Sequence, residues 1–186
     1  MRWISFLILA YVVLLIQTTL VRLVHFTVAS AGTIAPDLLA MVAVFVAMHV
    51  RSGADVMLAA WALGLAADLT TGGGPNALPA VGVMPIAYAL AAGMVYRLRE
   101  AFFAERVSTK IVLALLFCLV AHGIWVTVQS LLACRAMTWS AYGQMLVQAL
   151  GLSAYTAALM APAHWVLTRL GGLFVAAPAG RARRYR

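Results

Sequence analysis

The strongest constraint on the fold is the alternation of long apolar runs with short segments that hold most of the charged residues. Hydrophobic residues make up 65% of the 186-residue chain and charged residues only 10%, with a mean hydropathy of +1.00. A soluble domain usually has about a quarter of its residues charged. It could not contain this much apolar sequence without large exposed apolar patches. The sequence therefore predicts an all-α, polytopic membrane protein.

Six apolar runs are candidates for helices that cross about 30 Å of hydrocarbon. They cover residues 3–21, 38–50, 54–69, 77–96, 111–133 and 142–167. The first run exceeds the roughly 7–15 apolar residues of a signal peptide, so we expect an uncleaved helix. The short second and third runs, joined by Arg51-Ser52-Gly53, predict a helical hairpin, and a re-entrant pair is the alternative. Pro85 predicts a kink in the fourth helix.

The basic residues predict the orientation of these helices. With six spans, eleven of the 13 Lys and Arg residues lie on the side of the two termini, and only Arg22 and Arg135 lie on the other. By the positive-inside rule, both termini are cytoplasmic. We expect a six-helix membrane domain over residues 1–170 and a basic cytoplasmic tail over 171–186, which could attract anionic lipid.

The net charge of +8 does not indicate nucleic-acid binding, because the basic residues lie between apolar runs and in the tail rather than on one solvated face. The sequence has no Ser-His-Asp set, no HExxH motif and no phosphate-binding glycine loop. Cys118 and Cys134, on or near one helix, would lie about 24 Å apart, too far for a disulfide. We therefore expect no enzyme, no cofactor and no metal site.

Two acidic residues stand at the edges of the short apolar runs. Asp37 begins the second helix and Asp68 ends the third, both on the outer side of the predicted topology. The two carboxylates could share a proton, bind a cation or pair with Arg22. The favoured interpretation is structural, with Asp37 at a helix N-terminus and Asp68 bonded to backbone amides of the glycine turn at 72–74.

Polar and small residues within the runs predict contacts between helices. His122 and Gln129 share a face of the fifth helix, as do Gln144 and Gln148 of the sixth, and a hydrogen-bonded seam between the two helices is expected. A proton relay at His122 would need an acidic residue at the same depth, and none is expected there. Small residues four apart favour close helix packing, with one face available for a partner helix. They are Ala60 and Gly64, Ala62 and Ala66, Ala89 and Gly93, Ser153 and Ala157, and Ala157 and Ala161.

The order of features from Pro36 to Arg99 resembles the bacterial rod shape-determining protein MreD family. The similar pattern covers about a third of the chain. It consists of Pro36-Asp37-Leu38-Leu39, the Arg51-Ser52-Gly53 turn, Gly64 with Asp68-Leu69, a glycine turn around Gly73, Asn76-Ala77-Leu78, Tyr88, Gly93, Arg97 and Arg99. By this resemblance, the residues expected to serve structure or partner binding are Pro36, Asp37, Arg51, Gly53, Gly64, Asp68, Gly73, Asn76, Tyr88, Gly93 and Arg97. Pro79, Pro85 and the arginine-rich tail depart from the pattern.

The resemblance implies a non-enzymatic scaffold of the cell-wall elongation machinery in the bacterial inner membrane. Its implied partners are a single-span MreC-like protein, an MreB-like actin homologue and, indirectly, a RodA-like glycosyltransferase and a penicillin-binding transpeptidase. The family fold is also similar to the six-helix substrate-binding subunits of vitamin importers. The alternative function is therefore a small-molecule binding subunit that uses the Asp37 and Asp68 end as its site.

Overall fold

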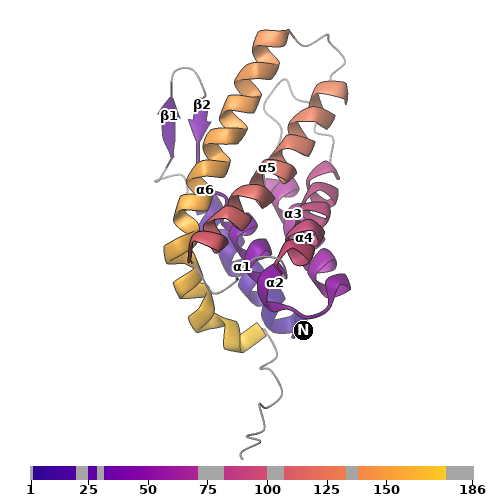
Figure 1. The fold of residues 1–186 in the computed structure, drawn as a ribbon, viewed down its shortest axis with the longest axis vertical. Coiled ribbons are helices and arrows are strands. Elements are labelled where there is room, and N and C mark those ends of the chain that lie inside the picture. Colours follow the sequence, from indigo (N-terminus) through magenta and orange to yellow (C-terminus); the bar gives the residue numbers. More distant parts are fainter. Residues whose placement is uncertain are drawn as a thin grey trace, which may run out of the picture.

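The computed structural model describes residues 2–19, 25–28, 32–70, 82–99, 107–132 and 138–174. In these residues the chain forms a bundle of six helices with a two-stranded sheet beside it (Figure 1). The elements are α1 (Trp3–Thr19), β1 (Phe26–Val28), β2 (Gly32–Ile34), α2 (Leu38–His49), α3 (Gly53–Thr70), α4 (Val83–Leu98), α5 (Val107–Leu132) and α6 (Trp139–Phe174).

The helices confirm the all-α prediction and lie close to the predicted runs. Three helical stretches are long and apolar enough to cross a membrane: Gly53–Thr70, Ser108–Leu132 and Trp139–Leu170. The helices α1, α2 and α4 are apolar but shorter. The chain is therefore all-helical in its main architecture, with a composition and helix length that fit a membrane protein.

Helix α2 occupies the centre of the bundle. It packs against each of the other five helices, and all nine residues from Leu39 to Ala47 are buried. A helix that is apolar on every side buries all of its side chains only when other helices surround it. Its 12 residues extend only about 18 Å, so its N-terminal end stops within the bundle while α5 and α6 continue past it (Figure 1).

Helices α3 and α4 approach each other closely at Gly64. A Cβ atom at this position would lie 2.7 Å from the carbonyl oxygen of Met84 and 2.8 Å from Cα of Pro85. Both are backbone atoms, so only a residue without a side chain fits. The small residues of this face are therefore used for packing inside the chain.

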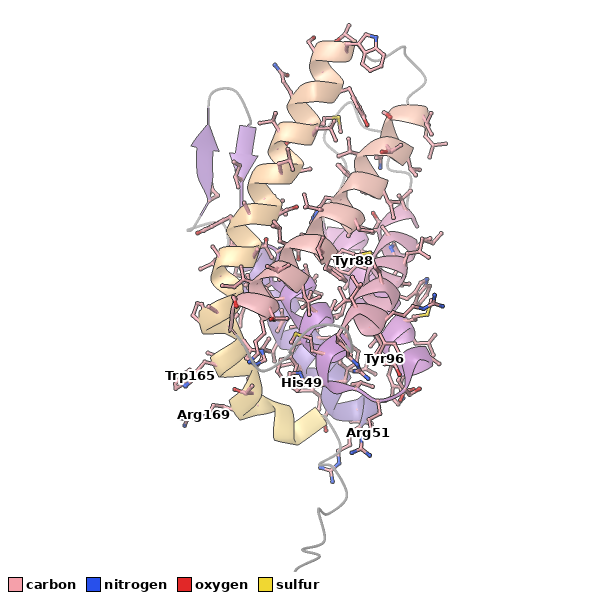
Figure 2. All side chains as sticks on the ribbon, in the orientation of Figure 1. His49, Arg51, Tyr88, Tyr96, Trp165 and Arg169 are labelled. Carbon is pink, nitrogen blue, oxygen red and sulfur yellow. The ribbon has the colours of Figure 1, made fainter. Side chains whose placement is uncertain are left out.

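Arg99 follows α4 and caps the C-terminus of α2. Its Nη1 donates hydrogen bonds to the carbonyl oxygens of Ala47 at 2.9 Å and Val50 at 2.6 Å, acceptors that a helix end leaves free. Its guanidinium lies 4.1 Å from the ring centroid of Tyr96. The Tyr96 hydroxyl donates to the carbonyl oxygen of Arg51 at 2.6 Å. These contacts fix the α2–α3 turn against the end of α4, as Figure 2 shows for the labelled Arg51 and Tyr96.

One proline and two helix boundaries differ from expectation. Helix α4 begins at Val83, so Pro85 lies in the first turn, where its missing N–H removes no intrahelical bond and causes no kink. Pro79 lies outside the described residues. Helix α6 contains Pro162 and continues to Phe174, four residues beyond the predicted end of the membrane domain.

The segment before α2, predicted as a loop, contains a short β-hairpin. β1 and β2 pair antiparallel, with Phe26 opposite Ile34 and Val28 opposite Gly32. β2 lies against α6 (Figure 1), where Gln148 Nε2 donates to the carbonyl oxygen of Thr33 at 2.9 Å. The side chain of Gln148 thus satisfies a backbone acceptor of the hairpin.

Candidate functional site

Asp37 is the N-cap of α2 and is buried. Its Oδ1 accepts a hydrogen bond from the backbone N–H of Ala40 at 3.0 Å, which satisfies one of the donors that a helix start leaves free. Its own backbone N–H donates to Oγ1 of Thr156 in α6 at 3.0 Å. The predicted place of Asp37 at the start of the second helix is therefore confirmed, and its backbone also ties α2 to α6.

The second carboxylate oxygen of Asp37 faces two side chains from other helices. The hydroxyl of Tyr88 in α4 donates a hydrogen bond to Oδ2, and Nε2 of His122 in α5 lies 3.6 Å from the same atom. All three side chains are almost removed from solvent, with exposed fractions of 7% for Asp37, 0% for Tyr88 and 6% for His122. A buried carboxylate is tolerated only with such partners.

Tyr88 is held in place by its ring as well as its hydroxyl. Its ring packs edge-on against Phe117 of α5 at a centroid distance of 5.1 Å, in the geometry that aromatic pairs prefer. Figure 2 labels Tyr88 at mid-height in the bundle. The polar cluster of Asp37, Tyr88 and His122 therefore joins α2, α4 and α5 around one carboxylate.

The other ring nitrogen of His122 already has a hydrogen-bond partner. Nδ1 lies 2.8 Å from the carbonyl oxygen of Cys118, and a carbonyl only accepts, so Nδ1 carries a proton. In the neutral ring, Nε2 is then an acceptor that faces the acceptor oxygen of Asp37. Two facing acceptors are compatible only when a hydrogen-bond donor lies between them.

This cluster corrects one expectation. His122 was expected to lack an acidic residue at its depth, yet Asp37 lies 3.6 Å from it. Because α2 extends only about 18 Å, its start meets His122 and Thr156, which lie in the middle of α5 and α6. The acidic neighbour of His122 is Asp37, brought there by the shortness of α2.

A cavity of about 290 Å³ opens beside the cluster and is lined by side chains from all six helices. Its polar lining residues are Gln17, Asp37, Thr70, His122 and Gln148. The rest of the wall is apolar or aromatic and consists of Ala35, Leu39, Ala67, Met84, Trp125, Val126, Met145, Ala149 and Leu152. Small-molecule sites are typically concave, mostly apolar and equipped with a few polar groups.

The expected seam between the fifth and sixth helices takes a different form. Gln148 bonds to Thr33 of β2, and His122 bonds to Cys118 and faces Asp37. Gln17 of α1, which the sequence-based interpretation missed, accepts from the N–H of Leu38 at 2.8 Å and donates to the carbonyl oxygen of Pro36 at 3.4 Å. These polar groups therefore hold the start of α2 from several sides.

Thr156 was also missed as a partner of Asp37. Gln17 and Thr156 are polar residues within apolar runs, and this isolation is the signal that could have identified them. Which helix faces they occupy depends on helix rotation, and hydropathy does not specify rotation.

Asp68 has a separate partner from Asp37. Its Oδ2 accepts a hydrogen bond from the backbone N–H of Gly82 at 2.6 Å, which joins the end of α3 to the start of α4. This matches the expected bond to a backbone amide, although Gly82 lies beyond the glycine turn itself. Arg22, proposed as a partner for either carboxylate, lies outside the described residues, as do Gly73 and Asn76.

The remaining predicted residues lie near the two ends of α3 and α4. Gly53 begins α3, and a Cβ there would lie 3.2 Å from the Tyr96 ring. Gly93 faces the Met57 side chain, with room for a Cβ at 3.7 Å. Arg97 is exposed in the last turn of α4. The structure thus brings Pro36, Asp37 and Tyr88 together in the core and leaves Arg97 on the surface.

In the described part of the chain, no three His, Cys, Asp or Glu side chains gather in a way that could hold a metal ion. The polar cluster can instead hold a proton or a donor group next to one buried carboxylate. Comparison of the chain with protein-family models, with curated proteins and with solved structures gives no match.

Proposed function

We propose that this chain is a non-enzymatic scaffold of the MreD type in the bacterial inner membrane, part of the machinery that elongates the cell wall. The observation that carries the proposal is that two residues of the MreD-like pattern, Asp37 and Tyr88, meet in the core across 51 residues of sequence. Arg99, a third residue of the pattern, binds the carbonyl oxygen of Ala47 at the end of α2 across 52 residues. A pattern whose members hold one another in place is what a family-wide scaffold requires.

The proposal includes six spans with both termini in the cytoplasm. The N-terminal end of α1 lies at the lower end of the bundle in Figure 1, and the labelled Arg51 and Arg169 lie at the same end in Figure 2. Basic residues gathered at one end of the helices support a cytoplasmic location for that end. The basic tail would then face anionic lipid on the cytoplasmic side.

A scaffold in a membrane binds its partner through helix surfaces that the bundle does not use. Several large apolar side chains of α1 are exposed, among them Ile4, Leu7, Ile8 and Tyr11. The small-residue pairs that include Gly64 and Ser153 are buried inside the chain. The proposed contact with a single-span MreC-like helix would therefore use larger apolar side chains rather than those pairs.

Co-purification tests the scaffold. Expressed with an MreC-like single-span protein, the tagged chain should capture that protein from mild detergent, and Asp37→Ala and Asp68→Ala should weaken folding or capture more than the change of any tail arginine. A folded chain that captures no cell-wall component from its native membrane would refute the proposed role. Wild-type-like expression and capture by both aspartate variants would refute the part assigned to these carboxylates.

The cavity beside Asp37 favours a second candidate, the substrate-binding membrane subunit of a small-molecule importer. It has the apolar wall and the few buried polar groups of a ligand site. Binding of a vitamin-sized ligand would raise the midpoint of thermal unfolding by mass action. A ligand screen that causes no such rise would reject this candidate and leave the scaffold proposal intact.

A further inference from the structure

We propose that the cavity beside Asp37 binds a small organic cation, an ammonium group attached to an apolar body. This ligand class rests on the second candidate function, because both concern the same cavity, and it specifies only what the cavity binds. It holds whether or not the chain delivers the ligand to a transporter.

The charge of the cavity lining favours a cationic ligand. The cavity lining contains one carboxylate, Asp37, and contains no Lys or Arg among its described residues, although the whole chain has a net charge of +8. An anionic ligand would meet a buried carboxylate with no Lys or Arg in the described lining to offset it, which is costly at low dielectric. A cationic group is the ligand charge that this wall stabilises.

Two hydrogen-bond acceptors of the cavity lining face each other. Oδ2 of Asp37 and Nε2 of His122 lie 3.6 Å apart, and the Nδ1 proton of His122 is already directed at Cys118. In the neutral ring, the two facing atoms are both acceptors. An ammonium N–H is a donor that satisfies such a pair.

Hydrogen-bond capacity at the carboxylate supports the same conclusion. A carboxylate offers about four acceptor positions. Oδ1 accepts from Ala40, and Oδ2 is approached by Tyr88 and His122. Only Ala40 and Tyr88 donate to the carboxylate when the imidazole is neutral, so acceptor positions remain for a charged donor.

The remainder of the cavity wall is apolar and aromatic. The indole of Trp125 and the thioethers of Met84 and Met145 line the same cavity. An indole ring attracts a cation, and more strongly when both are removed from water, and methionine adapts to apolar groups of varied shape. The wall therefore suits an apolar body that follows the ammonium group.

Three probes of similar size and different charge test the proposal on the purified full-length chain in detergent or nanodiscs. They are 2-phenylethylammonium, the neutral 2-phenylethanol and the anionic 3-phenylpropanoate, each titrated while thermal unfolding and binding heat are measured. The cation should raise the unfolding midpoint saturably and bind at least about tenfold more tightly than the alcohol. The anion should not bind.

Ala149→Phe tests whether the cavity is the site, because Ala149 lines it from α6. The larger side chain should occupy the cavity and abolish binding of the cation. The matched control is Ala154→Phe, which makes the same change on an exposed position of α6 and should leave binding unchanged.

Asp37→Asn tests the charge and keeps a side chain that caps helices well. In a folded variant, the preference for the cation over the alcohol should disappear. If this variant does not fold, the comparison of Ala149→Phe with Ala154→Phe still decides.

Three results would each overturn the inference: no binding of any probe to the folded wild type, equal affinity for cation and alcohol, or cation binding that survives Ala149→Phe. Binding of a neutral, vitamin-sized molecule without binding of the cation would refute the ligand class and leave the second candidate function standing.

Discussion

The hydroxyl of Tyr88 donates a hydrogen bond to the carboxylate of Asp37, and this contact joins the start of α2 to α4 across 51 residues of sequence. Both side chains are buried, so neither can exchange the lost bond for one to water. Removing one partner therefore destabilises the protein more than removing both, because the partner that remains is buried without its hydrogen bond.

Tyr88→Phe should lower the free energy of unfolding by about 1–3 kcal/mol, because Asp37 would keep a buried acceptor without its donor. Thermal or denaturant unfolding in detergent measures this change. The control is Tyr11→Phe, the same change at an exposed position of α1, which should leave stability unaltered. Equal stability of the two variants would show that the Tyr88 hydroxyl is not needed.

Gly64→Ala should destabilise the chain by about 1–3 kcal/mol, because the added methyl group would meet the backbone of α4 at Met84 and Pro85. The control is Gly123→Ala in α5, where a Cβ meets no atom within 4 Å. That variant should be neutral or more stable by up to about 1 kcal/mol, because alanine favours helix over glycine. Unfolding midpoints measured side by side test the difference, and a tolerated Gly64→Ala would contradict the close approach of α3 and α4.

Arg99→Ala should cost about 1.5–3 kcal/mol, since it removes a charged donor from two carbonyl oxygens at the end of α2. Arg97→Ala, two residues away and exposed, should change stability by no more than about 0.5 kcal/mol. Both variants remove one positive charge from the same end of α4, so their difference measures the specific contacts of Arg99 with the end of α2 and with the Tyr96 ring. Equal losses would assign the effect to charge alone.

Single cysteines test the proposed orientation in whole cells. In a background without Cys118 and Cys134, Thr138→Cys before α6 should react with a membrane-impermeant maleimide added from outside. Ser52→Cys in the α2–α3 turn should react only after the membrane is opened. Both positions are exposed, so accessibility to reagent depends on the side of the membrane. The reverse pattern would refute cytoplasmic termini.

The sequence predicted the features that depend on nearby residues. The Pro36-Asp37 pair predicted the start of α2, and Asp37 does cap that helix. Asp68 accepts a backbone N–H of the same connection, at Gly82 rather than at glycines 72–74, which lie outside the described residues. In each case the chemistry lies within one helix end or one connection, so local pattern and hydrogen-bonding capacity were sufficient.

The polar cluster could not be predicted in the same way. Its partners come from three other helices, and Thr156 is 119 residues from Asp37. Hydropathy gives the length of an apolar run but neither its rotation nor its depth relative to its neighbours. The shortness of α2 was visible in the sequence, yet its consequence, a carboxylate level with the middle of α5 and α6, required the packed structure.

The central position of α2 has a consequence for the order in which the protein is made. A ribosome completes α2 before the helices that supply the partners of Asp37. The carboxylate meets Tyr88 of α4 and His122 of α5, and the backbone N–H meets Thr156 of α6. Until α5 is made, the Asp37 carboxylate lacks one or both of these side-chain partners, and until α6 is made the Asp37 backbone N–H lacks Thr156. A chain truncated before α6 would keep that backbone N–H without its acceptor, a local difference from the finished protein that a cell's proteolytic quality control could detect.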